Sequence, residues 1–405
     1  MPVADRLLSP LRATRSLDDA IAGAPRQIDA LTGIRAVAAL WVVGFHFALS
    51  PLGALGLTAA FPVLSYGYLG VDLFFVLSGF IIYHVHQRDA GSLSMRGVLH
   101  FYGLRLARMY PVHLLTLCGL AVIVLAGRRV GIAPTHPEDF YPFDFRYNLL
   151  LIHSWGVADG IHWNSPAWSI SCEWFVYLFF PVLALWLNRL ASARQAVLFL
   201  AGEVVVFALA YVFLFHGDLD NKWDGHFARY ALARVCLEFT LGALCCRLRS
   251  FVDMRAWPWT AAVLAAMLVA ILLVATPLRD VAIVVVFVLA VLAASLPGNL
   301  VARVLALPVI VYLGEISYSL YMIHAPMRMT LGKLMEPRLL LLSRAGAALM
   351  AAGFLLVTVV AAAATYHIVE APARRWLRRL LDRTAEGATP RSRRHGPQYD
   401  APSAR

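Results

Sequence analysis

The most informative side chains are an arginine and a histidine in one apolar stretch near the N-terminus. Arg35 and His46 are eleven residues apart, close to three helical turns, so on a helix they project from the same face. The rise between them is about 16 Å. A charge inside a bilayer costs at least ~2.5–3.5 kcal/mol, so these groups need a functional or structural reason. The structural alternative is an arginine that reaches the inner surface and a histidine bonded to a neighbouring carbonyl.

Three further ionisable residues fall near the predicted outer ends of later apolar segments: Asp72, Glu173 and His324. If the segments are helices that pack together, we expect these residues and His46 to meet in one layer. A histidine beside a carboxylate is the arrangement of a general base, because the carboxylate orients and stabilises the imidazolium. We therefore predict His46, Glu173 and Asp72 as catalytic residues. The alternative is a buried polar cluster that joins helices.

Arginines at helical spacing indicate a second kind of site on the inner side. Arg105 and Arg108 are three residues apart, so their guanidinium groups share one helix face, a geometry suited to phosphate. Together with Arg35 they predict a site for a phosphate-rich ligand, and the alternative is a positively charged inner flank. Arg234 and Glu238, four residues apart, instead predict a structural ion pair.

The composition requires a membrane to surround these residues. Of the 405 residues, 60% are hydrophobic and 15% are charged, against about 45–50% and 25% in soluble domains. A chain of this size has too little interior to bury that surface, so a soluble enzyme is excluded. The net charge of +11 is explained by basic inner loops, and no nucleic acid is expected as a partner. The five cysteines lie in apolar runs, which excludes a disulfide framework, and no metal site is expected.

The apolar segments predict an all-α, polytopic membrane protein with about ten transmembrane helices. More basic residues fall on the predicted inner segments than on the outer ones, so both termini are expected to be cytoplasmic. We divide the chain into a cytoplasmic leader (1–30), a transmembrane domain (31–368) and a cytoplasmic tail (369–405) that is basic and amphipathic, then disordered. The candidate helices are 31–49, 68–87, 107–126, 167–187, 195–216, 230–247, 258–275, 281–296, 307–327 and 345–368.

Six phrases of this sequence, in order, resemble the acyltransferase-3 family of membrane-bound O-acyltransferases. They cover about residues 28–376, and their number and order make the resemblance specific. The phrases are LTGIRAVAALWVVGFHF, GYLGVDLFFVLSGFII, RLARMYPVHLL, NSPAWSISCEWFVYLFFPVL, LGEISYSLYMIHAPM and YHIVEAPARRW.

The resemblance implies a ten-helix enzyme that moves an acyl group, often acetyl, from a cytoplasmic donor to sugar hydroxyls of surface or exported glycans. It implies that Arg35 and His46 are the family's essential pair. The loop arginines of the family fall on Arg105 and Arg108, and the glutamate of its fourth helix falls on Glu173.

We therefore expect a multi-pass O-acyltransferase of the plasma (inner) membrane. Acetyl-CoA or another acyl-CoA is the expected co-substrate, with its phosphates on the three arginines and its thioester near the imidazole. The expected partners are a glycan or glycolipid acceptor and membrane lipids. The predicted acceptor-binding residues are Tyr318, Tyr321, His324 and Trp168, and a membrane-interface belt is the alternative for the aromatic ones.

Alternatives remain open at this point. His46 either deprotonates the acceptor hydroxyl or carries the acyl group itself. A transporter or flippase also uses buried histidine and glutamate, and it is the rival from another class. An acyltransferase that modifies a lipid or an antibiotic is the alternative within the same class.

Overall fold

The described part of the chain is entirely helical. The computed structural model describes residues 28–48, 61–90, 93–132, 134, 136–158, 160–217, 219, 227–251, 258–273, 276, 278–332 and 343–387. Every regular element in these ranges is an α-, 3₁₀- or π-helix. The predicted leader up to residue 27 and the predicted disordered tail after residue 387 lie outside the described residues.

Each of the ten apolar segments forms a helix or a pair of helices. The main elements are α2 (Asp29–Ala48), η2 (Pro62–Leu69), α4 (Gly70–Ala90), α5 (Met95–Arg129), α7 (Trp168–Asn188), α8 (Ala193–Phe213), α9 (Phe227–Arg249), α10 (Trp259–Leu272), α11 (Arg279–Ala294), α12 (Leu300–Leu305), α13 (Pro308–Glu315), α14 (Ser317–Met327), the π-helical η6 (Arg328–Gly332), α16 (Arg344–Thr365), the π-helical η7 (Tyr366–Glu370) and α17 (Ala371–Gly387). Short helices between α5 and α7 are η3 (Pro137–Phe140), η4 (Pro142–Asp144), α6 (Phe145–Leu149) and η5 (Ser165–Ala167).

Six helical stretches within the described ranges are long and apolar enough to cross a membrane. They are Asp29–Phe47, Pro62–Gln87, Met95–Arg129, Ser165–Asn188, Ala193–Phe213 and Ala348–Arg383. These stretches agree with a polytopic membrane protein. The number of ten crossings and the cytoplasmic position of both termini stay predictions.

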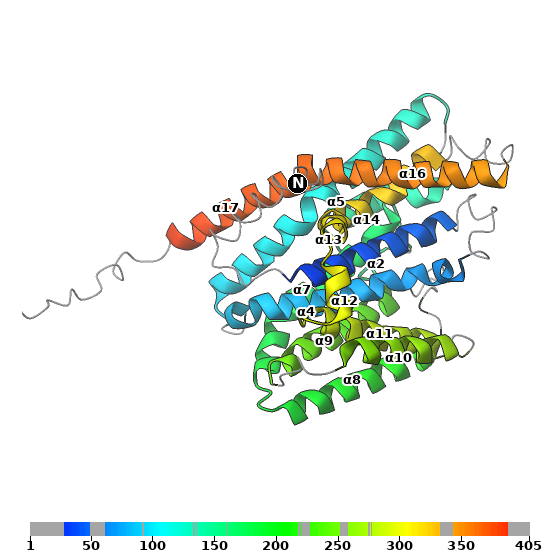
Figure 1. Ribbon diagram of the computed structural model, residues 1–405. Coiled ribbons are helices and arrows are strands. Elements are labelled where there is room, and N and C mark those ends of the chain that lie inside the picture. Colours follow the sequence, from blue (N-terminus) through cyan, green and yellow to red (C-terminus); the bar gives the residue numbers. More distant parts are fainter. Residues whose placement is uncertain are drawn as a thin grey trace, which may run out of the picture.

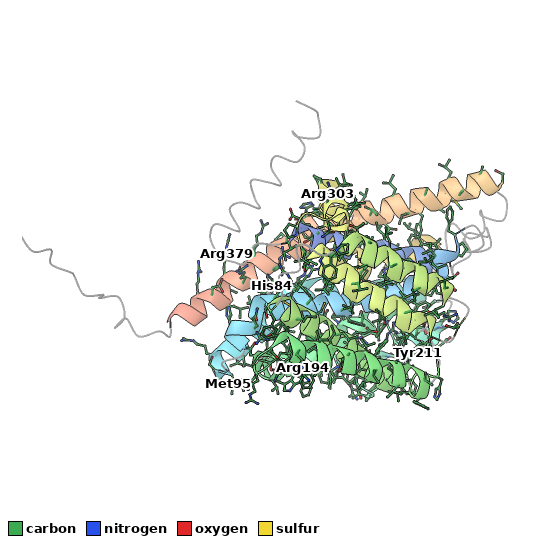
Figure 2. All side chains as sticks on the ribbon, turned by 60° about the horizontal axis from the view of Figure 1, so that its bottom comes forward. His84, Met95, Arg194, Tyr211, Arg303 and Arg379 are labelled. Atoms are coloured by element: carbon green, nitrogen blue, oxygen red, sulfur yellow. The ribbon has the colours of Figure 1, made fainter. Side chains whose placement is uncertain are left out.

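The long helices lie roughly side by side, with α16 and α17 along one edge of the bundle and α8 at the opposite edge (Figure 1). Figure 2 shows Met95, the first residue of α5, and Arg379 of α17 toward one end of the molecule. Tyr211, near the last residue of α8, lies toward the other end (Figure 2). The basic start of α5 and the basic α17 therefore share one end of the bundle.

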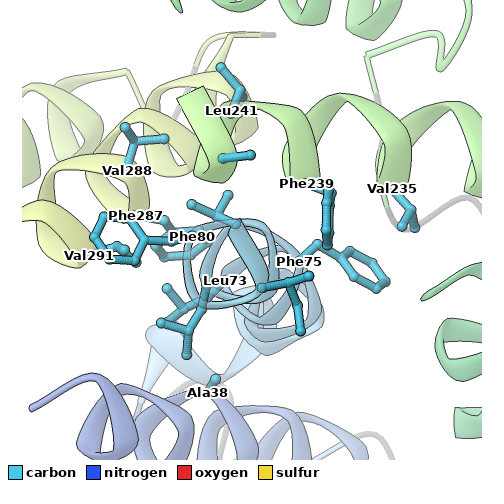
Figure 3. Close-up of a cluster of buried hydrophobic side chains, with 14 of the residues drawn as sticks. Ala38, Leu73, Phe75, Phe80, Val235, Phe239, Leu241, Phe287, Val288 and Val291 are labelled. Carbon is cyan, nitrogen blue, oxygen red and sulfur yellow. The ribbon is translucent and has the colours of Figure 1, made fainter. Parts of the chain in front are cut away.

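Helix α4 is the centre of the core. Figure 3 looks along α4 and shows apolar side chains of α2, α9 and α11 gathered around it. Phe80 of α4, Phe239 of α9 and Val291 of α11 have no exposed surface. Such a helix, apolar on several faces, is typical of an element surrounded by other helices.

Glycines allow α4 and α9 to cross closely. A Cβ atom placed on Gly79 would lie 1.9 Å from the carbonyl oxygen of Phe239, and one on Gly242 would lie 1.9 Å from that of Val76. Only residues without a side chain fit on both sides of this crossing. Small residues at helix contacts are a frequent means of close packing in membranes.

Two segments differ from the sequence prediction in extent. Helix α5 begins at Met95, about three turns before the predicted segment 107–126, because Ser94 caps its N-terminus and the polar residues that follow are still helical. The predicted segment 307–327 is divided at Ile316 into α13 and α14. Hydropathy marks the apolar part of a helix and not its ends, so neither feature is visible in the apolar pattern.

Candidate active site

Two histidines from different helices form an imidazole pair. His46 lies on α2 and His324 on α14, and their ring centroids are 4.9 Å apart. Nδ1 of His46 is 2.9 Å from the carbonyl oxygen of Val42, and Nδ1 of His324 is 2.6 Å from that of Tyr321. A neutral imidazole that donates from Nδ1 has its lone pair on Nε2, the atom that accepts a proton in general-base catalysis.

The burial of His324 makes this pair unusual. His324 has no exposed surface, and its Nε2 has no hydrogen-bond partner among the residues the structure describes. His46 is half-buried. Of the four residues predicted to share one layer, the structure brings His46 and His324 together, and the buried Nε2 of His324 is a polar atom without a partner in the described residues.

A set of half-buried and buried charged side chains, here called the arginine cluster, lies toward the N-terminal end of α2. It contains Arg35 of α2, Arg105 and Arg108 of α5, Glu173 of α7 and Glu370 of η7. Arg35 is within electrostatic range of Arg105, Arg108 and Glu173. Within the described residues, Arg35 makes no ion pair, and Nε of Arg105 is buried without a partner. The meeting of these three arginines is as the sequence predicts.

Glu173 belongs to this cluster and not to the imidazole layer. Its Oε1 accepts hydrogen bonds from Ser78 of α4, at 2.7 Å, and from Tyr177 one turn along α7. Arg105 lies close to both Glu173 and Tyr177. The carboxylate therefore orders the guanidinium side of the site, which differs from the expected place beside His46.

Glu370 is a site residue that the sequence did not single out. It is 1% exposed, its Oε1 forms an ion pair with Arg108, and its Oε2 accepts a hydrogen bond of 2.6 Å from Ser319. The guanidinium of Arg108 also lies 5.4 Å from the ring centroid of Tyr318. The signal available was a glutamate at the end of the last apolar segment, where a buried carboxylate needs a cation.

Asp72 pairs with an arginine and not with an imidazole, so its predicted place beside His46 is wrong. Both of its carboxylate oxygens accept hydrogen bonds from Arg234 of α9, and Asp72 has no exposed surface. Glu238 is 3.6 Å from the same guanidinium, which confirms the predicted i, i+4 pair. A carboxylate placed in the membrane pairs with the nearest cation, and the packing of α4 against α9 brings Arg234 to it.

The aromatic residues predicted to bind the acceptor make contacts and hydrogen bonds with other residues of the protein. Trp168 is 3% exposed and lies edge-on to Phe75, with ring centroids 6.0 Å apart. The hydroxyl of Tyr321 donates to the carbonyl oxygen of Pro166 at 3.0 Å, and that of Tyr318 donates to a carbonyl oxygen of α5. In this conformation these rings join helices and do not offer a face for stacking on a sugar.

Asn164, in the segment between α5 and α7, joins two helices of the bundle. The amide of Asn164 donates to Thr116 of α5 at 3.2 Å and to the carbonyl oxygen of Met322 at 3.1 Å, so it links α5 to α14 two residues before His324. Within this segment, burial lowers the pKa of His153 to about 3, and the nearby His113 adds to the effect. A histidine this difficult to protonate is neutral at physiological pH.

These features define a class of protein: a chain whose described part is helical, with several helices able to cross a membrane, an imidazole pair, and a cluster of arginines that the first helix shares with α5. The family model for the acyltransferase domain of the acyltransferase-3 family matches residues 28–367. This match covers most of the chain, so the chain belongs to the acyltransferase-3 family.

Several curated protein sequences are similar to parts of the chain. The protein named "Acyltransferase MdmB" of Streptomyces mycarofaciens is 34% identical over 161 residues, 38% of this chain and 39% of that protein. "Protein 2 in picA locus" of Rhizobium radiobacter is 31% identical over 204 residues, 46% of this chain and 95% of that protein. A "Putative O-acetyltransferase" of Staphylococcus aureus is 25% identical over 214 residues, 49% of this chain and 32% of that protein.

The chain thus spans well under half the length of the first and third of these relatives. No solved structure matches the chain significantly.

Proposed function

We propose that this protein is a membrane O-acyltransferase that moves an acyl group, with acetyl expected, from cytoplasmic acyl-CoA to a hydroxyl of a surface or exported glycan. The single observation that carries the proposal is the position of an arginine and a histidine at two separate places along α2. Arg35 lies among Arg105 and Arg108, and His46 lies about 16 Å further along the same helix, beside His324. An acyl-CoA has the matching shape, because its phosphates and its thioester are the two ends of an extended molecule.

The charge of the arginine cluster supports an anionic ligand at the inner end. Its three arginines are accompanied by the carboxylates of Glu173 and Glu370, of which Glu370 is bonded to Arg108. A phosphate is a strong partner for guanidinium groups, because it accepts two charge-assisted hydrogen bonds from one guanidinium. The nucleotide end of acyl-CoA supplies this charge, and the pantetheine arm leads away from it along α2.

At the other end, His46 acts as the general base. Its Nε2 takes the proton of the acceptor hydroxyl while that oxygen forms a bond to the carbonyl carbon of the thioester. The C–S bond then breaks, the CoA thiolate leaves, and the proton on the imidazolium passes to the thiolate or to solvent. The neighbouring His324 is buried, and its Nε2, which has no hydrogen-bond partner among the described residues, is placed to hold the acceptor hydroxyl.

Purified protein and radiolabelled acetyl-CoA test this function. His46→Ala should reduce acetyl transfer to envelope glycans by a factor of about 10² to 10⁴, the usual contribution of a general base. Arg35→Ala should raise the KM for acetyl-CoA. The control is His84→Ala, which removes an imidazole from α4, a helix that carries neither His46 nor His324. It should leave transfer within a factor of two.

Full transfer activity of folded His46→Ala would overturn the proposed mechanism. Label that stays on the protein and is lost in His46→Ala would instead identify an acyl-histidine relay. Movement of a glycan across the membrane without acylation would replace the enzyme with a transporter.

A further inference from the structure

A fourth arginine lies beside the arginine cluster, on an element that follows the last long apolar helix. Arg374 is in the first turn of α17 and is half-buried. It lies within electrostatic range of Arg108 and Glu370 and beside Tyr366. The mechanism above does not use it.

The other arginines of α17 show that this position is not typical of the helix. Arg375, Arg378 and Arg379 are exposed, and the side chain of Arg378 is 53% exposed. Exposed arginines after a membrane helix are explained by the positive charge of inner flanks. Arg374 follows Glu370 by four residues, about one helical turn, which places it on the same helix face as the carboxylate that pairs with Arg108.

The charges of these side chains do not balance, which indicates an anionic ligand. The arginine cluster has three positive charges and two negative ones, and Arg374 beside it raises the excess of positive charge from one to two. Like charges in a medium of low dielectric constant repel each other strongly. An anion of two or more negative charges, such as a pair of phosphates, restores the balance.

Both carboxylate oxygens of Glu370 are bonded to other side chains. One oxygen pairs with Arg108 and the other accepts from Ser319 at 2.6 Å. It therefore fixes the direction of the Arg108 guanidinium through a bond that crosses from η7 to α5. A carboxylate committed in this way acts as a positioning residue.

Helix α17 is held against α5 by contacts further along. A Cβ atom on Gly103 of α5 would lie 2.7 Å from the side chain of Leu381, so the two helices meet closely there. Asp382 lies 3.5 Å from His100 of α5. These contacts, with the ion pair of Glu370, hold α17 at both ends of its first three turns and set the place of Arg374.

We propose that Arg374 is a fourth binding residue for the phosphates of the acyl donor, and that Glu370 is the positioning residue that holds Arg108 for the same phosphates. The helix after the last long apolar stretch thereby completes the donor site. This inference rests on the proposed function and adds to it the residues of α17 and η7 that select a phosphate-bearing donor.

The test compares two donors that share a thioester and differ in phosphate: acetyl-CoA and S-acetylpantetheine, which has none. Arg374→Ala should raise the KM for acetyl-CoA roughly tenfold or more, as expected for the loss of a charge-assisted hydrogen bond, with kcat little changed. The kinetics with S-acetylpantetheine should stay as in the wild type. Arg375→Ala removes the same charge from the exposed side of α17 and should change neither.

Glu370 is tested in the same assay. Glu370→Gln should raise the KM for acetyl-CoA and leave S-acetylpantetheine unaffected, and Glu370→Asp should restore part of the affinity because it keeps the charge. Binding of CoA itself, measured by calorimetry without turnover, should weaken in Arg374→Ala and Glu370→Gln by the same factors as the KM.

Equal losses with both donors would show a purely structural role for Arg374 and Glu370 and overturn the inference. Wild-type turnover with CoA binding that is unchanged in Arg374→Ala would remove the inference and leave the proposed function standing. A wild-type protein that neither binds CoA nor transfers acetyl would remove the proposed function itself.

Discussion

The buried and half-buried arginines of the described helices have two different surroundings. Arg234 is held by both oxygens of Asp72, with Glu238 at 3.6 Å, so its charge is fully compensated by the protein. Arg35 and Arg105 lie in a cluster whose positive charge exceeds its negative charge. A compensated arginine joins helices, whereas the excess of positive charge around Arg35 and Arg105 supports their proposed role in binding an anion.

The substitution Asp72→Asn tests the structural role of the pair between Arg234 and Asp72. The change leaves Arg234 in the core without its main counter-charge, and breaking a buried pair on one side costs about 3–5 kcal/mol. We expect a large fall in the temperature of unfolding in detergent. Glu138→Gln, at a side chain that is 71% exposed, should leave the temperature of unfolding close to that of the wild type. A variant of Asp72 as stable as the wild type would show that Arg234 is held by other contacts.

At the scale of elements, the site depends on how α2 and α4 are packed. Helix α2 carries Arg35 and His46 and therefore sets the distance between the two ends of the site. Helix α4 packs between α2 and α9 and supplies Ser78 to Glu173. The close crossing of α4 and α9 at Gly79 and Gly242 keeps this arrangement in place.

Gly79→Ala tests the crossing. The added methyl group would lie 1.9 Å from the carbonyl oxygen of Phe239, so α4 and α9 must separate. We expect loss of stability of several kcal/mol and loss of acyl transfer, because overpacking displaces backbone. Gly202→Ala on α8 meets nothing within 4 Å and is the matched control. It should be neutral or stabilising by up to about 1 kcal/mol. Equal unfolding temperatures for the two variants would contradict the close crossing.

At the scale of the whole molecule, the predicted topology places the basic ends of the bundle in the cytoplasm. Met95 and Arg379 lie toward the same end, and Tyr211 lies toward the other (Figure 2). A donor site at the arginine cluster and an acceptor site at the imidazole pair would then face opposite sides of the membrane. The acyl group would pass through the protein along α2.

Cysteine labelling tests this orientation. A cysteine at Arg379, on the exposed side of α17, should react with a membrane-impermeant maleimide only in inside-out vesicles. A cysteine at Val157, which is 43% exposed, should react only in right-side-out vesicles. The experiment starts from a variant in which the five native cysteines are replaced. Labelling of both positions from one side would rule out the predicted topology.

Much of the helical structure is predictable from the residues alone. The lengths of the apolar runs locate all ten helical segments, and the spacing of Arg35 and His46 places them on one helix face, because both features depend on neighbours within a few turns. The divided segment at Ile316 was not predictable, since both halves are apolar.

The partners of the charged residues were decided only by the tertiary structure. Arg234 reaches Asp72 across 162 residues and Arg108 reaches Glu370 across 262, so no local pattern relates them. A carboxylate in an apolar segment must find a cation, and this need is visible in the sequence. Which cation it finds depends on which helices lie side by side, and that is determined by the packing of glycines and apolar side chains over the whole bundle.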